Sequence, residues 1–221
     1  MKKMTILIFI IMLASLWAGG LQEYVENPDF RNFLRTADSL NKVNSQIELA
    51  YLLNFELERQ IAKLDSSFYE LDLQAQFSLA NLKLGMGKYE PAITIYEEIN
   101  QQYPKWSCPW RHKGEALFKS GKLAKSERAL KKAIETRKQH YDAYVMLAEV
   151  QKEQNEYQQA LKTLQEGMKY RNKDIEEGEV DELETDFLML ELLELNHKPA
   201  DELKERLKQQ APSHHYWQSN M

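Results

Sequence analysis

Apolar residues recur every three to four positions along most of the chain, and this is the spacing of one buried helix face. Residues 28–64 show the pattern in two stretches, and a Ser-x-x-Glu capping box at Ser45 opens the second. Toward the other end, an apolar stripe from Val180 to Leu193 predicts a helix, and Pro199 opens the next one. The chain is therefore expected to be all-α.

Between residues 73 and 174 the pattern repeats every 34 residues without a gap, in units 73–106, 107–140 and 141–174. The eighth positions hold Ala80, Gly114 and Ala148, and the twentieth hold Ala92, Ser126 and Ala160. The fifteenth positions hold Gly87, Gly121 and Asn155. Small residues let two antiparallel helices approach closely where they cross, and Gly or Asn suits the turn between them. The spacing predicts a helix–turn–helix repeat.

This unit resembles the tetratricopeptide repeat, and the resemblance covers about 102 residues. Some positions depart from the family pattern. Gln76 replaces a large residue, Lys113 an apolar one and Ile99 a small one. Lys138 and Asn172 stand where the pattern has the proline that only Pro104 supplies. The resemblance implies a right-handed α-solenoid of stacked helix pairs with helical flanks. It also implies a role in binding, because such solenoids use their long concave surfaces to hold partners.

The ends of a solenoid need atypical caps with a polar outer face. We expect residues 21–72 to form an N-terminal helical hairpin or cap. Residues 175–212 are expected to form a degenerate fourth repeat or a C-terminal cap, with Ala200 at the twentieth position of that repeat. The tail, residues 213–221, shows no periodicity and is predicted to be loose.

The first twenty residues have a pattern of their own. Lys2 and Lys3 precede an apolar run that ends near Ala18 and Gly20, which is the order of a secretory signal peptide. The run is short for a bilayer span, which needs about 20 residues. We expect residues 1–20 to be removed and the chain to be extracytoplasmic, or periplasmic in a diderm bacterium. The alternative is an uncleaved segment that anchors the chain to the inner membrane.

Composition and charge restrict the class of partner. Hydrophobic residues make up 43% of the chain, enough for a packed core, and the net charge is −5. Loss of the signal would remove two lysines and leave −7, so nucleic acid is not an expected partner. The single cysteine, Cys108, cannot form an intrachain disulfide, so packing alone must hold the fold. The expected partner is a protein or peptide.

No residue pattern points to catalysis. None of the five histidines lies in a recognisable metal or nucleophile motif, and Cys108 has no identifiable His or resolving Cys beside it. The adjacent His214 and His215 could hold a metal weakly, but a solvated tail is favoured because no acidic or Cys partner is identifiable. We expect that the chain is not an enzyme and that it needs no cofactor or metal.

The resemblance also implies which side chains line the concave face, because family members use set positions of each unit's first helix. The predicted groove residues are Gln74, Phe77, Asn81, Arg111, Glu115, Phe118, Asp142, Val145, Glu149 and Lys152. Apolar residues among polar ones suit an extended peptide or a partner helix. The acids among them would repel a C-terminal carboxylate, so a mixed, slightly basic ligand is expected. The alternatives are a groove filled by the chain's own C-terminal helix and one that is merely solvated.

Two charged stretches favour other hypotheses. Residues 122–138 carry seven Lys or Arg, and residues 174–194 carry ten acids and no Lys or Arg. Solvated faces are the ordinary interpretation, but the stretches could also dock head-to-tail, or the basic one could contact anionic lipid as a peripheral membrane contact. The first hypothesis is a non-catalytic adaptor in a cell-envelope or secretion assembly, monomeric or weakly self-associating. The alternative is a structural solenoid that self-associates through the two stretches.

Overall fold

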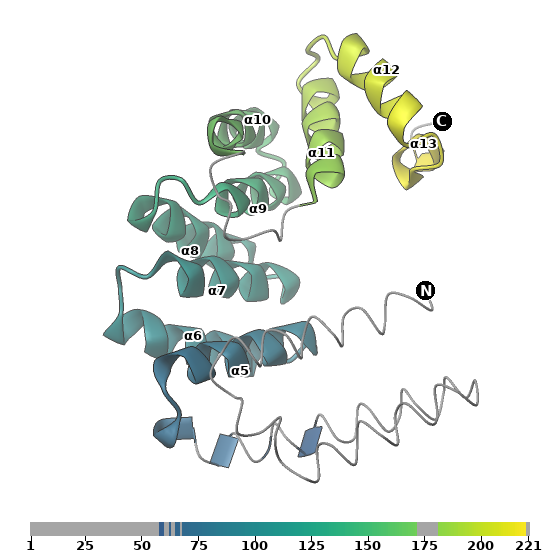
Figure 1. Cartoon of the computed structure of the whole chain (residues 1–221). Helices are drawn as coiled ribbons and strands as arrows, with labels where there is room; N and C mark the ends of the chain where they lie inside the picture. Colours follow the sequence, from purple (N-terminus) through teal and green to yellow (C-terminus); the bar gives the residue numbers. More distant parts are fainter. Residues whose placement is uncertain (1–57, 60–61, 63–64, 67, 172–180, 220–221) are drawn as a thin grey trace, which may run out of the picture. The chain divides into compact units, whose positions relative to one another are not determined.

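The computed structural model describes residues 58–59, 62, 65–66, 68–171 and 181–219. Regular structure within these ranges is entirely helical, and consecutive helices pack as helix–turn–helix pairs (Figure 1), which confirms the predicted fold class. The predicted signal peptide at 1–20 and most of the predicted cap at 21–72 lie outside the described residues. Among the helices that are described, none is both long enough and apolar enough to cross a bilayer.

The chain divides into two compact units, Met1–Ile95 and Tyr96–Met221. The first unit contains the short 3-10 helix η1 (Phe68–Glu70) and then α5 (Leu73–Gly85). Helix α6 (Tyr89–Gln102) starts in the first unit and ends in the second. Asp72 caps α5 by accepting a hydrogen bond from the backbone N of Ala75 at 2.8 Å. Gln76 donates to the carbonyl oxygen of Leu71 at 3.0 Å. Its departure from the repeat pattern therefore ties the first repeat to the segment before it.

The second unit holds the remaining helices. They are α7 (Ser107–Lys119), α8 (Leu123–Thr136), α9 (Tyr141–Glu153), α10 (Tyr157–Gly167), η2 (Met168–Tyr170), α11 (Glu182–Leu195), α12 (Asp201–Gln210) and α13 (His215–Ser219). Each first helix packs against its second, and α8 and α10 contact the first helix of the next pair. The first helices α7, α9 and α11 follow one another, with α9 contacting both of the others (Figure 1).

The turns between paired helices follow the predicted positions. Gly87, Gly121 and Asn155 have positive φ angles of 75°, 76° and 63°, which Gly and Asn tolerate best. After Gly121, the backbone N of Lys122 donates back to the carbonyl oxygen of Leu117 at 2.8 Å, and the same bond closes the other turns. The prediction of these three turn residues is confirmed.

Small residues lie at the helix crossings, as predicted. Ser126 is fully buried, and its hydroxyl donates to the carbonyl oxygen of Gly114 at 2.7 Å across the α7–α8 pair. A Cβ atom added at Gly114 would lie 2.5 Å from Cγ of Leu130. Ala148 and Ala160 are fully buried in the next pair. Close approach of the two helices therefore requires these residue types.

Lys113, which stands where the family pattern has an apolar residue, is accommodated by its neighbours. Its ammonium lies 5.3 Å from the ring centroid of Trp110 and 3.0 Å from Oε1 of Glu97. The indole N–H of Trp110 in turn donates to the carbonyl oxygen of Pro104 at 3.0 Å. The lysine side chain is therefore largely buried, with 16% exposure, while its charge is paired with Glu97.

The fourth helix pair exists, but its predicted register is wrong. Helix α11 begins after its N-cap Asp181 and has 14 residues, where α5, α7 and α9 each have 13. The turn that follows places His197 at φ 53°, and α12 begins at Asp201 with Ala200 as its N-cap. A longer first helix and a longer turn therefore leave Ala200 outside the second helix, so it cannot occupy the crossing position.

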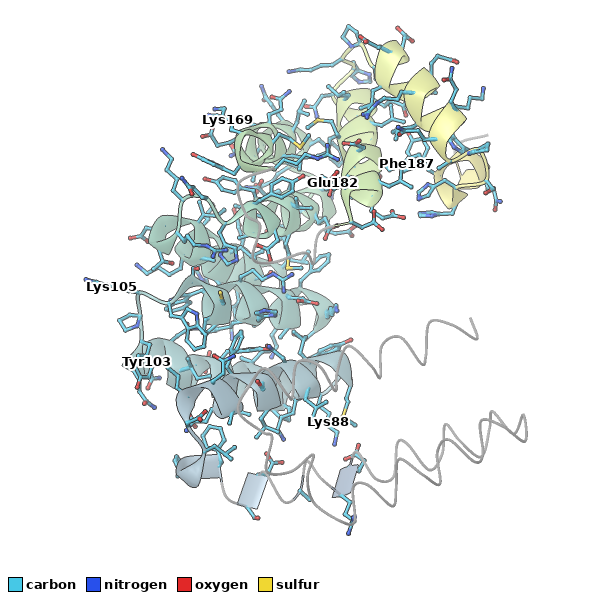
Figure 2. All side chains as sticks on the ribbon, viewed as in Figure 1. Lys88, Tyr103, Lys105, Lys169, Glu182 and Phe187 are labelled. Atoms are coloured by element: carbon cyan, nitrogen blue, oxygen red, sulfur yellow. The ribbon has the colours of Figure 1, made fainter. Side chains whose placement is uncertain are left out.

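Residues 215–219 of the tail form a helix, where the sequence predicted a loose segment at 213–221. Helix α13 buries Tyr216, and it packs against a cluster that includes Phe187, Leu190 and Leu207. Phe187, labelled in Figure 2, lies on the side of α11 that faces α12 and α13. The indole N–H of Trp217 donates to the carbonyl oxygen of Ala211 at 2.9 Å. Two aromatic side chains thus fix a helix that is too short to show periodicity in the sequence.

Candidate functional site

The predicted groove residues of α7 and α9 form an ion-pair network. The Nε atom of Arg111 lies 2.5 Å from Oδ2 of Asp142, and Arg111 Nη1 donates to Oε2 of Glu115 at 2.8 Å. Both members of the first pair are buried, with side-chain exposures of 7% and 5%. His140, which is fully buried, places Nε2 at 2.9 Å from Oδ1 of Asp142. The structure therefore brings three of the predicted residues together, but in contact with one another.

Neighbouring charges favour the ionised forms of Asp142 and Glu115, because they lower the pKa of both carboxyls. Burial raises the pKa of the Asp142 carboxyl, but the hydrogen bond from His140 and the charge of Arg111 outweigh burial and lower it well below its ordinary value. Burial likewise opposes ionisation of Glu115, and the charges of Arg111 and His112 with the hydrogen bond from Lys119 lower its pKa. Arg111 is thus neutralised by two carboxylates inside the protein.

Two other predicted groove residues, Phe118 and Val145, pack against the core. Phe118 packs against the buried cluster of Leu130, Leu147 and Val150. Val145 is half-buried against a cluster that includes Ala148 of α9 and Leu188 of α11. In the first unit, Gln74 is exposed, Asn81 is half-buried, and Phe77 is buried with 8% exposure.

Glu149 on α9 differs from the other ionisable groove residues, because the described parts of the chain offer its carboxylate no hydrogen bond or ion pair. It is half-buried, and burial raises its pKa. Lys152 lowers that pKa and Glu115 raises it, and the net shift is upward. The ammonium of Lys152 is itself held 2.8 Å from Oε2 of Glu191 on α11.

We define the α9 site as Val145, Glu149 and Lys152. Glu115 and Arg111 of α7 act on the charge of Glu149, and Glu191 of α11 pairs with Lys152, so the site is bordered by both neighbouring first helices. It offers a partly desolvated negative charge beside an apolar surface. Such a combination suits contact with a ligand that carries a positive charge beside an apolar group.

Sequence reasoning assigned no role to two histidines of this region. His140 precedes α9 and supports Asp142, as described above. His112 stacks on Tyr96 with ring centroids 5.9 Å apart, and its Nδ1 lies 2.9 Å from Nη1 of Arg111. The sequence carries no signal for either contact, because each depends on how successive repeats are stacked.

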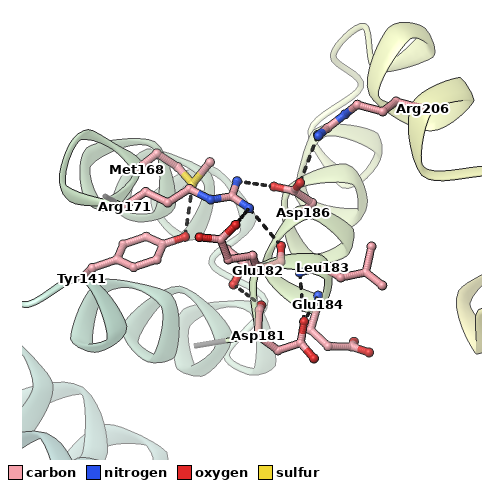
Figure 3. A network of polar contacts seen from close by, with 10 residues as sticks. Tyr141, Met168, Arg171, Asp181, Glu182, Leu183, Glu184, Asp186 and Arg206 are labelled. Carbon is pink, nitrogen blue, oxygen red and sulfur yellow. Dashed lines mark hydrogen bonds and ion pairs between the residues drawn. The ribbon is translucent and has the colours of Figure 1, made fainter. Parts of the chain in front are cut away.

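The acidic residues of α11 make ion pairs within the chain, and Figure 3 shows those of Glu182 and Asp186. Arg171 places Nη1 at 2.6 Å from Oδ1 of Asp186, and Arg206 of α12 places Nη2 at 3.1 Å from Oδ2 of the same carboxylate. Nη2 of Arg171 also lies 3.3 Å from Oε2 of Glu182, and Nζ of Lys204 lies 2.6 Å from Oε1 of Glu194. Arg171 thus joins the end of the third helix pair to α11, and Lys204 and Arg206 join α12 to α11.

The basic residues of α8 lie largely at the protein surface. Lys131 and Lys132 pair with Glu127 and Glu135 of the same helix at 2.7 and 3.0 Å. Lys125 and Arg128 are exposed. Such surface pairs contribute little to stability, typically about 0.5 kcal/mol or less.

Comparisons with known proteins agree with this architecture. Models of the tetratricopeptide repeat match residues 74–105 and 117–178, which supports such repeats in both segments. A comparison with curated proteins found no match.

Solved structures share the fold. YrrB, described as a tetratricopeptide protein with an unusual peptide-binding site, is 16% identical with a TM-score of 0.56, over 89% of this chain and 95% of its own. MamA is 16% identical with a TM-score of 0.54, over 68% and 82%. A thermophilic tetratricopeptide protein from Thermus thermophilus is 19% identical with a TM-score of 0.52, over 83% and 92%. At these identities the likeness concerns the fold alone.

Proposed function

We propose that this chain is a non-catalytic, extracytoplasmic adaptor that holds a segment of a partner protein against the α9 site, within a cell-envelope or secretion assembly. Tetratricopeptide-repeat proteins generally mediate protein–protein interactions, and the similar structure of YrrB is described as having a peptide-binding site. The observation that carries the proposal is Glu149, a half-buried carboxylate for which the described part of the chain supplies no partner.

A partly desolvated carboxylate is costly to leave unpaired, because burial removes water that would otherwise solvate the charge. The neighbouring cations are already engaged, Lys152 by Glu191 and Arg111 by Asp142 and Glu115. A cation from a partner would therefore supply Glu149 with the ion pair that the described part of the chain does not provide. The partner segment is one that presents a Lys, an Arg or an N-terminal amine.

Apolar surface accompanies this charge. Val145 lies one helical turn before Glu149, on the same face of α9, and it is only half-buried by the cluster beneath it. A ligand that places an aliphatic residue beside its cation would cover both. This refines the sequence-based expectation of a mixed, slightly basic ligand, in which Arg111 was to contribute directly to binding.

The alternative, self-association through the charged stretches, has less support. It needs acids that are free to meet the basic face of a second copy. Within the described part of 174–194, however, Glu182, Asp186, Glu191 and Glu194 already contact basic residues of the same chain. The competing idea that the C-terminal helix fills the groove is also disfavoured, because α13 buries its aromatic residues against α11 and α12.

Site-specific photo-crosslinking in cells tests the proposal. Benzoylphenylalanine at Val145 should give a discrete adduct with one envelope protein, and the same probe at Lys125 on α8 should give none. Glu149→Lys should abolish the adduct formed from position 145, because it reverses the charge that the partner meets. An adduct formed from position 125 alone, or an adduct from 145 that survives Glu149→Lys, would contradict the proposal.

A further inference from the structure

The C-terminal helix brings together a set of metal-ligating side chains that the sequence keeps apart. Nε2 of His214 lies 2.9 Å from Oε1 of Glu184, and the ring of His215 lies 4.1 Å from that of His214, centroid to centroid. Each of the three residues offers one ligand atom, and these atoms all lie within 4.8 Å of one another. We propose that Glu184, His214 and His215 bind a divalent transition metal ion, with Zn²⁺ as the best match.

The donor set supports this assignment. Two imidazole nitrogens and one carboxylate oxygen are typical ligands of Zn²⁺, with a water molecule in the remaining position. Tetrahedral coordination at about 2.0–2.1 Å places neighbouring ligand atoms roughly 3.4 Å apart. The separation of up to 4.8 Å therefore requires a shift of about 1 Å, which exposed His215 at the start of α13 can supply.

The ring of His214 and the backbone of Glu184 are held in position. The ring of His214 is stacked on Phe187, with centroids 3.6 Å apart and planes 7° from parallel, and its side chain is only 10% exposed. Glu184 lies in the first turn of α11, where its backbone N–H donates to Oδ1 of Asp181 at 3.2 Å. Packing thus holds the ring of His214, while the cap fixes the backbone of Glu184 and its carboxylate is directed by the contact with His214.

The exchange at His214 is balanced. The metal ion takes the place of the hydrogen bond between Nε2 of His214 and Oε1 of Glu184. The single proton of the neutral ring moves from Nε2 to Nδ1 by exchange with water, so Nδ1 no longer accepts the 3.3 Å contact from the backbone N of Tyr216, which is longer than a typical hydrogen bond. The loss is small beside the formation of three coordinate bonds.

The consequence of binding is structural. Glu184 belongs to α11, and the two histidines belong to the segment that places α13 over the cluster of Phe187, Leu190 and Leu207. The metal would fasten the last helix to the first turn of α11, and it would stabilise the folded end of the chain by mass action. This site departs from the sequence-based prediction of no metal, which rested on the lack of an acidic partner for the histidine pair.

Calorimetric titration of the full chain with Zn²⁺ after treatment with EDTA tests the inference. One ion should bind per chain, and Glu184→Gln and His215→Ala should each weaken binding at least tenfold. His197→Asn and Glu205→Gln serve as matched controls, because both residues are exposed and lie outside the cluster. His197→Asn also keeps a residue that tolerates φ 53°.

A second readout keeps the test independent of the fold of the variants. Zn²⁺ should raise the melting temperature of the wild type and of both controls, EDTA should reverse the rise, and His215→Ala should abolish it. Bound Co²⁺ should give the visible absorption of a tetrahedral site in the wild type and in both controls, and should give none in His215→Ala. No binding by the wild type, or binding unchanged in both Glu184→Gln and His215→Ala, would overturn the inference.

Discussion

Arg111 and Asp142 belong to successive repeats, and their side chains meet inside the protein with Nε and Oδ2 2.5 Å apart. The pair joins α7 to α9 at the depth of the binding face, and Glu115 and His140 complete the contacts of its two members. These charges therefore stabilise the stacking of repeats. Glu149, about two helical turns after Asp142 on α9, is the carboxylate that we propose a partner contacts.

Removal of Asp142 should be costly. Asp142→Ala leaves Arg111 and His140 buried beside a lost carboxylate, and should lower the free energy of unfolding at pH 7 by about 3 kcal/mol. Urea denaturation followed by circular dichroism measures this change. The matched control Glu135→Ala removes an exposed pair with Lys132 and should cost less than about 0.5 kcal/mol. Equal costs would mean that the pair does not hold the repeats together.

The same carboxylate predicts a dependence on pH. Because folding lowers the pKa of Asp142, its contribution is complete above the ordinary carboxyl pKa and is lost as pH falls through about 4 and below. The difference in stability between the wild type and Asp142→Asn should shrink over that range in denaturation curves. A difference that stays constant down to a pH of about 2.5 would refute the assignment.

Glu149 should behave in the opposite way. Its pKa is raised on folding, so its charged form opposes folding and the penalty appears as pH rises through the carboxyl range. Glu149→Gln should therefore stabilise the protein at pH 7 by about 0.5–1 kcal/mol, and should have no such effect at pH 3, where the carboxylic acid is neutral. Thermal melts at the two pH values measure this. A destabilised Glu149→Gln at pH 7 would indicate a structural partner for the carboxylate.

The close helix crossing at Gly114 can be tested by a single methyl group. Gly114→Ala forces Cβ to within 2.5 Å of Leu130 unless the helices move, and should cost about 1–3 kcal/mol. Gly121→Asn is the control, since nothing lies within 4 Å of its added Cβ and Asn accepts φ 76°. Chemical denaturation of both variants provides the comparison, and a tolerated Gly114→Ala would show that the pair is looser than described.

The N-terminal prediction concerns residues outside those described. If residues 1–20 are a cleaved signal, protein recovered from the envelope fraction should begin near Leu21. Intact-mass measurement decides this directly. Full-length, soluble protein found in the cytosol would remove the compartment in which the adaptor is proposed to act.

The local rules of the repeat were accessible from the sequence, because turn and crossing positions depend on backbone angles and side-chain size. Gly121 and Ser126 illustrate this. The left-handed backbone conformation of His197 was not predicted, because the irregular fourth turn imposes it and histidine does not itself favour it.

Contacts between repeats were not accessible in the same way. The sequence placed Arg111, Asp142 and Glu149 on one face, but which of them pair depends on distances across helices. Glu184 and His214 are separated by 30 positions, and their contact requires the fold of the tail. Sequence periodicity gives the face on which a side chain lies, while its partners follow from packing.

The central claim is that Glu149 receives a cation from a partner segment. The most direct test selects a displayed random peptide library against the full chain, and then measures dissociation constants of the enriched peptides. Enriched peptides should share a Lys or Arg, and Glu149→Gln should weaken their binding by about tenfold or more, while Glu153→Gln, an exposed carboxylate on the same helix, should leave it within about twofold. Enriched acidic peptides whose binding is unchanged by Glu149→Gln, and lost when Lys125 and Lys132 are both changed to Ala, would contradict the account.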